Sequence, residues 1–243
     1  MSFPLLHRKL DGSNLLVFLD MEGTEFSHEA IAIGIVGYEK RIGELLPISQ
    51  KPTFTYSSLI KAKNNIGRKV SELTGITKEE LKAEGKDYLE VVRDITTLTR
   101  PYSDCTLYFG PLDIKILSAT TNYANEMESN YLRHLKKKSV DFFTYLEERL
   151  VDSKGQPYGI ARLGKKFSLT FEGKQHDPLY DALALSNIYF YIVSHEEELL
   201  EDYLKNYLQN PFTEETNKEV AKRILEGKMV DKETLAEILK ENL

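Results

Sequence analysis

The sequence has one cysteine, no tryptophan and no long uninterrupted hydrophobic segment. A single thiol, Cys105, excludes an internal disulfide scaffold and is typical of proteins from a reducing compartment. The longest charge-free run of the C-terminal half, Ala182–Ser194, is shorter than the roughly 18 apolar residues that cross a bilayer. Residues 1–10 carry charges and lack the apolar stretch of a secretory signal. We therefore expect a cytoplasmic protein with no membrane-spanning segment.

An excess of basic residues is also missing. The net charge is −6, and the residues from Glu196 onward hold 13 acidic and 7 basic side chains, so the first 195 residues are formally neutral. Proteins that coat a nucleic-acid duplex normally carry a basic excess. Any nucleic acid bound by this chain would therefore be held locally, through a few phosphates.

The composition is that of an ordinary globular protein. Apolar residues make up 41% of the chain and charged residues 29%, which excludes a disordered chain. A length of 243 residues suits one large domain, or one of about 190 residues with a small appendage. Because the composition shifts to Glu and Leu near residue 195, we predict one domain over 1–195 and an acidic extension over 196–243.

Short apolar runs predict a buried sheet. Leu15–Leu19 has no polar alternation, which is typical of a strand covered on both faces. Ala30–Val36 is a second strand, and a third is predicted near Glu44–Ser49, so that the three form an antiparallel meander. Cys105–Phe109 is another buried strand, and Ser139–Phe143 is a short strand that leads into a helix.

Helices are predicted where apolar residues recur every three or four positions, or where a proline suits the first helical turn. They cover 66–73, 78–82, 87–99, 111–125, a segment ending near 150, 178–193, 214–225 and 232–242. Strands first, then helices alternating with strands, favour a mixed α/β sheet flanked by helices, with a helical C-terminal extension.

The extension carries apolar side chains at helical spacing. They are Leu199, Leu200, Tyr203, Leu204, Tyr207 and Leu208. Packing on the preceding domain is the default interpretation of such a stripe. A dimer contact or a protein partner is the alternative, and the sequence leaves this choice open.

Carboxylates directly follow two of the predicted strands. Asp20 and Glu22 come after Leu15–Leu19, and residues two apart in an extended chain point to the same side. Two adjacent carboxylates repel each other unless a cation or a shared proton offsets the repulsion. Asp113 follows Cys105–Phe109 after a Gly-Pro turn and lies in the first turn of the predicted helix.

A third group stands at the start of the long helix near residue 178. Asp177 can cap this helix and Pro178 can begin it, which places Asp181 about one turn in, with His176 just before the cap. Each group has an ordinary explanation by itself: a polar strand end, an acid at a helix start, or a surface histidine. The three groups together are far more specific.

Their order resembles the DnaQ-like, or DEDDh, 3′–5′ exonuclease family. The matching residues are Asp20 and Glu22 in the first motif, Asp113 in the second, and His176 with Asp181 in the third. Leu73–Thr77 (LTGIT) resembles a segment often found between the first two motifs. The second motif departs from the family, because it reads Phe-Gly-Pro-Leu-Asp where an aromatic residue commonly precedes the acid, with an Asn upstream. The resemblance covers about residues 13–195.

The resemblance implies a DEDDh exonuclease domain with a ribonuclease H-like fold. The implied activity is hydrolysis at the 3′ end of single-stranded DNA or RNA, with release of nucleoside 5′-monophosphates. The four acids would hold two divalent ions, and all-oxygen ligands suit Mg²⁺ or Mn²⁺ better than zinc. His176 would be the general base, since an imidazole can accept a proton at neutral pH.

Substrate contacts are expected next to the first motif. By the same resemblance, Gly23 and Thr24 approach the terminal 3′-hydroxyl. Phe26 either stacks on the last base or is a buried structural residue, and Tyr108 and Phe109 are interpreted as core residues. Two basic clusters either guide phosphates or form solvated helix faces. They are Arg133 with Lys136, Lys137 and Lys138, and Arg162 with Lys165 and Lys166.

Two other classes of function remain as alternatives. A non-catalytic nucleic-acid-binding or regulatory module could keep the same fold, but all five catalytic positions are filled. A purely structural scaffold leaves the carboxylates unexplained. The choice between DNA and RNA depends on contacts to the 2′-hydroxyl and stays open.

Overall fold

The computed structural model describes residues 4–122, 126–147, 150–152, 154–171, 173–209 and 214–241. Two compact units make up this structure. One is Pro4–Tyr191, and the other contains the described residues from Ile192 onward. No helix within the described residues combines the length and apolarity that crossing a bilayer requires.

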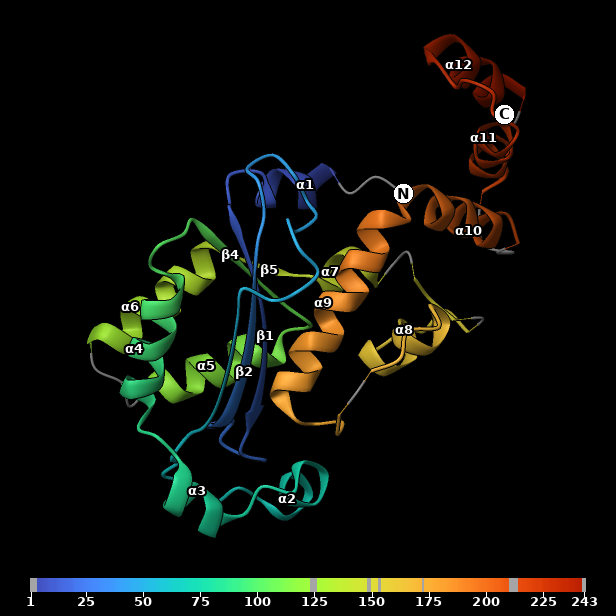
Figure 1. The fold of residues 1–243 in the computed structure, drawn as a ribbon. Coiled ribbons are helices and arrows are strands. Elements are labelled where there is room, and N and C mark those ends of the chain that lie inside the picture. Colours follow the sequence, from blue (N-terminus) through green and yellow to red (C-terminus); the bar gives the residue numbers. More distant parts are fainter. Residues whose placement is uncertain are drawn as a thin grey trace. The chain divides into compact units, whose positions relative to one another are not determined.

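A five-stranded sheet forms the centre of the first unit, in the order β3-β2-β1-β4-β5 (Figure 1). The strands are β1 (Leu15–Gly23), β2 (Ala30–Glu39), β3 (Phe54–Leu59), β4 (Asp104–Tyr108) and β5 (Ser139–Asp141). The pairs β1–β2 and β2–β3 are antiparallel, whereas β1–β4 and β4–β5 are parallel. The predicted mixed sheet, a meander plus parallel strands, is therefore confirmed.

The third strand is not where the sequence predicts it. Residues 44–49 form no strand, and β3 begins at Phe54. Gly43 adopts a positive φ of 84°, and the chain closes on itself through a bridge between Lys40 and Pro47. Leu46 and Ile48 in this loop are exposed, and Leu45 is only partly buried, so the apolar residues that suggested a strand are not core residues.

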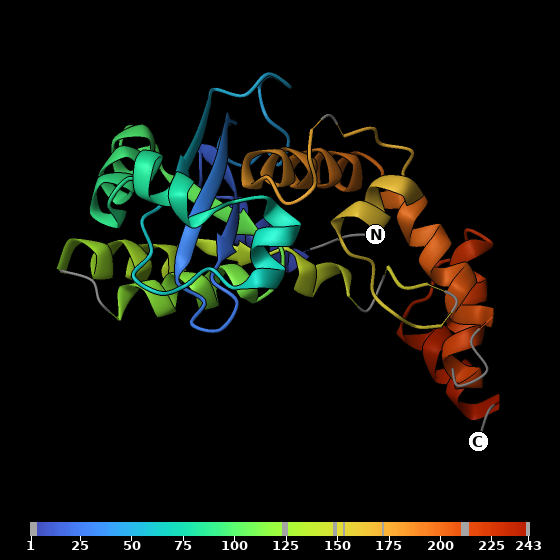
Figure 2. The same cartoon turned by 90° about the horizontal axis from the view of Figure 1, so that it is seen from below.

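Some helices of the first unit cover the two faces of the sheet, and others lie beyond the ends of its strands (Figures 1 and 2). They are α1 (Pro4–Leu10), α2 (Arg68–Thr74), α3 (Lys78–Glu84), α4 (Tyr88–Thr99), α5 (Leu112–Thr121), α6 (Glu126–Lys137), α7 (Phe143–Leu146), α8 (Ile160–Lys166) and α9 (Pro178–Ser194). The sequence did not predict α1, α6 or α8 as elements. Pro111 precedes α5 instead of beginning it, and Asn125, the predicted end of that helix, lies outside the described residues. The helix after β5 ends at Leu146, not near residue 150.

Alternate side chains of β1 enter two different parts of the core. Leu15, Val17 and Leu19 belong to a buried cluster with residues of α4, α5 and α6. Phe18 points to the opposite face, where its ring centroid lies 5.4 Å from that of Tyr189 in α9. This alternation is typical of a central strand buried on both sides.

The second unit is helical. It contains α10 (Glu196–Gln209), α11 (Glu215–Leu225) and α12 (Lys232–Glu241), and α11 contacts both of the others. The two predicted helices of the tail are confirmed, although Asn242, the predicted end of the last one, is outside the described residues. Leu199 and Leu204 of the predicted apolar stripe are buried, and Tyr207 is a residue whose side chain is not described. A dimer or partner contact stays a prediction.

Candidate active site

Two carboxylates extend from β1 on the face of the sheet that α9 covers. Asp20 and Glu22 alternate with Met21, which belongs to the buried cluster on the opposite face. They therefore lie on the same side as Phe18, close to the C-terminal end of the strand. Both side chains are partly buried.

The first turn of α9 lies against the sheet at Gly34 of β2. Gly34 pairs with Asp20 in the β1–β2 register. A Cβ atom on Gly34 would collide with the backbone of Pro178 and Leu179. The side chain of Asp177 accepts the Leu179 N–H at 3.0 Å and so caps the helix, as the sequence predicts. The missing side chain at Gly34 thus lets α9 begin beside the β1 carboxylates.

Asp113 approaches the same point from α5. It lies in the first turn of that helix and is only 5% exposed. The Met21 N–H donates to Asp113 Oδ1 at 2.9 Å, so the backbone between Asp20 and Glu22 holds this carboxylate. The preceding turn is fixed in the same way, because the Gly110 N–H donates to Asp141 Oδ1 at 2.8 Å.

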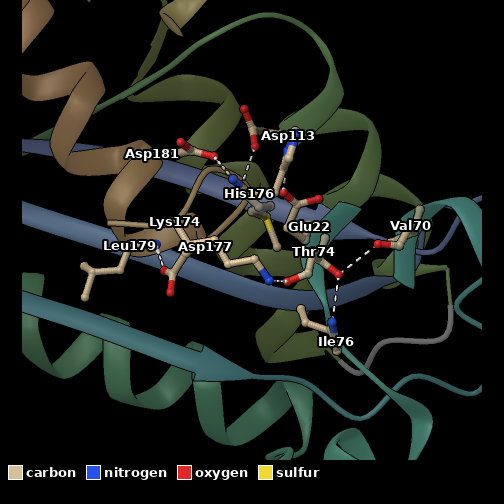
Figure 3. A network of polar contacts seen from close by, with 11 residues as sticks. Glu22, Val70, Thr74, Ile76, Asp113, Lys174, His176, Asp177, Leu179 and Asp181 are labelled. Carbon is tan, nitrogen blue, oxygen red and sulfur yellow. Dashed lines mark hydrogen bonds and ion pairs between the residues drawn. The ribbon is translucent and has the colours of Figure 1, made fainter. Parts of the chain in front are cut away.

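His176 brings an imidazole to these acids (Figure 3). Its backbone is left-handed, with a φ of 65°, and its N–H donates to Asp181 Oδ2 at 3.1 Å. Its Nδ1 lies 3.6 Å from Glu22 Oε1, and the ring is 38% exposed. Potential ligand atoms of Glu22, His176 and Asp181 all lie within 4.8 Å of one another. The structure therefore gathers the three sequence motifs at one site.

Burial raises the pKa of all four carboxyl groups, and the charges of neighbouring acids add to the effect. For Asp20, burial is the main cause, followed by the charges of Asp113, Asp181 and Glu22. Burial, together with the charge of Asp181, raises the pKa of Glu22 to about 7. Burial also raises the pKa of Asp181, although the His176 N–H opposes the change. The pKa of Asp113 is raised by burial, and the Met21 N–H counteracts this in part.

These side chains line one cavity of about 850 Å³. Gly23 and Thr24 also line it, but the Thr24 hydroxyl already contacts Ser27 Oγ at 2.6 Å and accepts the Glu29 N–H. Phe26 is 83% exposed and is not among the lining residues. Its interpretation as a buried structural residue is wrong, and its stacking role stays a prediction.

An apolar wall of the cavity was missed by sequence reasoning. Leu73, Leu112 and Tyr180 line the cavity with exposed side chains. Leu112 and Tyr180 each immediately precede a motif acid, and this proximity in the sequence could have predicted that both line the site. Phe109, interpreted as a core residue, also lines the cavity, and its ring lies 5.3 Å from that of Phe143.

Cationic side chains complete the lining. They are Lys69 on α2, Arg162 and Lys165 on α8, and Lys174 before α9. Arg162 forms an ion pair with Asp152 at 2.7 Å and lies 4.7 Å from the ring centroid of Tyr158. Of the two basic clusters in the sequence, only the one on α8 contributes residues to the cavity lining.

Comparisons with known proteins match this chain to nucleases. A profile of the RNase_T family, described as "Exonuclease", matches residues 17–189. No curated protein sequence matches the chain.

Solved exonuclease structures share the fold. A full-length 3′-exonuclease is 16% identical, with a TM-score of 0.55 over 76% of this chain and 62% of that one. The nuclease domain of 3′hExo, a DEDDh family member bound to rAMP, is 16% identical, with a TM-score of 0.54 over 75% and 92%. E. coli Exonuclease I with a dT13 oligonucleotide is 15% identical, with a TM-score of 0.58 over 86% and 46%. The present chain thus matches less than two thirds of the full-length 3′-exonuclease. The expected ribonuclease H-like fold is confirmed.

Proposed function

Because the chain belongs to the RNase_T exonuclease family, with the DEDDh pattern, we propose that it is a metal-dependent 3′–5′ exonuclease. It would hydrolyse the last phosphodiester bond of single-stranded DNA or RNA and release a nucleoside 5′-monophosphate. The observation that supports this proposal best is the convergence of four acids and one histidine on a single cavity.

The side chains fit hard divalent cations. Carboxylate oxygens are the ligands that Mg²⁺ and Mn²⁺ prefer. Burial, and after it repulsion between neighbouring acids, raises the pKa of Asp20 and Glu22, and a bound cation would favour the charged form of both. Asp20, Glu22 and Asp181 would hold one ion, and Asp20 with Asp113 would serve a second. Bound ions of this kind activate a water and stabilise the leaving oxygen of an in-line displacement.

His176 would accept the proton of the attacking water. Its ring faces the cavity, and its Nδ1 is the nitrogen closer to Glu22. With the proton of the neutral ring on Nδ1, Nε2 is the basic atom. The N–H of His176 donates to Asp181, so the backbone that carries the base is tied to a proposed metal ligand.

The remaining lining suits a nucleotide end. A base can stack on or beside Leu73, Leu112 and Tyr180, since apolar and aromatic surfaces accept every base. Lys69 and Lys165 would contact phosphates, which position a strand without reading its sequence. The E. coli neighbour holds dT13, and another solved 3′-exonuclease recognises the 3′ end of a histone mRNA stem-loop. DNA and RNA therefore both belong in the test.

The deciding experiment is degradation of matched 5′-labelled DNA and RNA oligonucleotides, single- and double-stranded, with Mg²⁺ or Mn²⁺. We expect a ladder that shortens from the 3′ end and disappears with Asp20→Asn. Asp94→Asn is the matched control, because Asp94 pairs with Lys86 and does not line the cavity. Internal cuts alone would contradict the proposal, and strand binding without cleavage would favour the non-catalytic module.

A further inference from the structure

Lys174 joins two segments that are far apart in the sequence. Its Nζ donates to the main-chain oxygen of Thr74, the last residue of α2, at 2.9 Å (Figure 3). The side chain of Thr74 is engaged separately, since its hydroxyl donates to Val70 O and accepts the Ile76 N–H. Carbonyls at a helix end lack helical partners, and a cation there is favourable. Lys174 therefore caps the C-terminal end of α2 from another part of the chain.

Gly75 leaves the space that this contact needs. It follows α2 in the left-handed conformation, with a φ of 80°. A Cβ atom at this position would lie 2.6 Å from Lys174 Nζ. The left-handed backbone favours glycine at this position, and an added Cβ would push the Lys174 ammonium away from its present place. The contact gives the LTGIT segment a physical role that sequence resemblance alone does not supply.

The other end of the contact leads directly to the proposed base. Lys174 lies two residues before His176, and the Asp177 N–H donates to Lys174 O at 3.1 Å, which closes a turn around the histidine. Gly173 and His176 both have positive φ values, of 121° and 65°. For a residue such as histidine this conformation persists only where surrounding contacts enforce it. Lys174 fixes the start of this turn, and Asp181 fixes the His176 N–H.

We propose that Lys174 is a positioning residue that sets His176 relative to the α2 wall of the cavity. That wall supplies Lys69, Val70 and Leu73 to the lining. A nucleotide seated on α2 would therefore reach a fixed place relative to the imidazole. This inference rests on the proposed exonuclease function, and Lys174 itself does not act on the reacting atoms.

The test measures kcat and KM for a 5′-labelled oligonucleotide with Lys174→Met and Lys174→Arg. Misplacement of a catalytic group by about 1 Å can slow a reaction on the order of 100-fold. We expect Lys174→Met to lower kcat by about 10- to 100-fold with KM within about threefold of the wild-type value. Lys174→Arg should recover most of kcat, because its guanidinium can still donate to Thr74 O.

Lys165→Met is the matched comparison. It removes the same charge from the cavity lining, but Lys165 has no contact with α2 among the described interactions. We expect this variant to raise KM more than it lowers kcat. If Lys174→Met behaves like Lys165→Met, the lysine contributes charge and not position, and the inference is wrong.

Gly75→Ala disturbs the same contact at its α2 end, because the added Cβ would lie 2.6 Å from Lys174 Nζ. If both substitutions act through it, the double variant Gly75→Ala/Lys174→Met should be no slower than the slower single variant. Additive losses would overturn the inference, as would an unchanged kcat for Lys174→Met or no recovery with Lys174→Arg. Lys174→Gln replaces Lys174→Met if the latter does not fold, as judged by its thermal unfolding midpoint. A wild-type protein that shortens no oligonucleotide with either metal refutes the proposed function itself, which is a distinct outcome.

Discussion

The carbonyl group of Pro178 occupies the place where a side chain on Gly34 would stand. Gly34 is also the residue of β2 that pairs with Asp20 of β1. The start of α9 therefore contacts β2 directly opposite Asp20, the first acid of the site. Substitutions at Gly34, and separately at Glu22, Asp113 and His176, test how the site is held.

Gly34→Ala should displace the start of α9 and separate Asp181 from Asp20. Overpacking of this kind lowers the free energy of unfolding by about 1–3 kcal/mol. We expect activity to fall by a larger factor than the loss of folded protein explains, as measured by urea unfolding and oligonucleotide degradation. Gly12→Ala is the control, because no atom lies within 4 Å of its added Cβ. Wild-type turnover in Gly34→Ala would show that the contact does not position the acids.

Removing the metal should make stability depend on pH through Glu22. Its pKa is raised from 4.5 to about 7, so the folded state holds its proton more tightly than the unfolded state does. The unfolding free energy therefore decreases as pH rises across this interval. The stabilisation that protonated Glu22 provides is fully lost above about pH 7.

Thermal unfolding of chelator-treated protein from pH 5 to 8 tests this dependence. Glu22→Gln should flatten the slope relative to wild type, and Mn²⁺ at pH 8 should stabilise wild type more than the variant. Parallel pH profiles for the two proteins would contradict the assignment.

Asp113→Asn and Asp113→Ala should be equally inactive but differ in stability. The amide oxygen of Asn can still accept the Met21 N–H, which now donates to Asp113 Oδ1 at 2.9 Å. Ala leaves this buried donor without a partner, which destabilises a protein by about 1–3 kcal/mol. Urea unfolding without metal should therefore rank the Ala variant well below the Asn variant. Equal unfolding midpoints would mean that the hydrogen bond adds nothing to the fold.

His176→Asn tests the imidazole without disturbing the backbone. Asn tolerates the left-handed conformation that His176 adopts at a φ of 65°. Loss of a general base lowers turnover by about 10²–10⁴-fold. The variant should still bind Mn²⁺, as measured by titration with the metal. Turnover close to that of wild type would remove His176 from the proposed mechanism.

The parts of the site that sequence predicts are those with local signals. Asp20 and Glu22 directly follow the apolar run that begins β1, and Pro178 marks the start of α9, so the position of each acid on its element follows from its neighbours. The third strand was misplaced because Ile48 and its neighbours are apolar but lie in an exposed loop. Local hydrophobicity does not distinguish a buried strand from an apolar loop at the surface.

Contacts between distant segments were beyond sequence reasoning. Lys174 and Thr74 are 100 positions apart. Neither has an unusual local pattern, and a lysine before a helix is ordinarily a solvated residue. The same holds for Gly34, whose need to be glycine comes from the backbone of α9. Such requirements appear only when the elements are placed in space.

The antiparallel β1–β2 pair is complete within the first 39 residues, whereas Asp181 enters with α9. During synthesis, the ribosome must therefore add more than a hundred further residues before the last acid can join the first two. The carboxylate set of the candidate site is therefore incomplete in any nascent chain that still lacks α9.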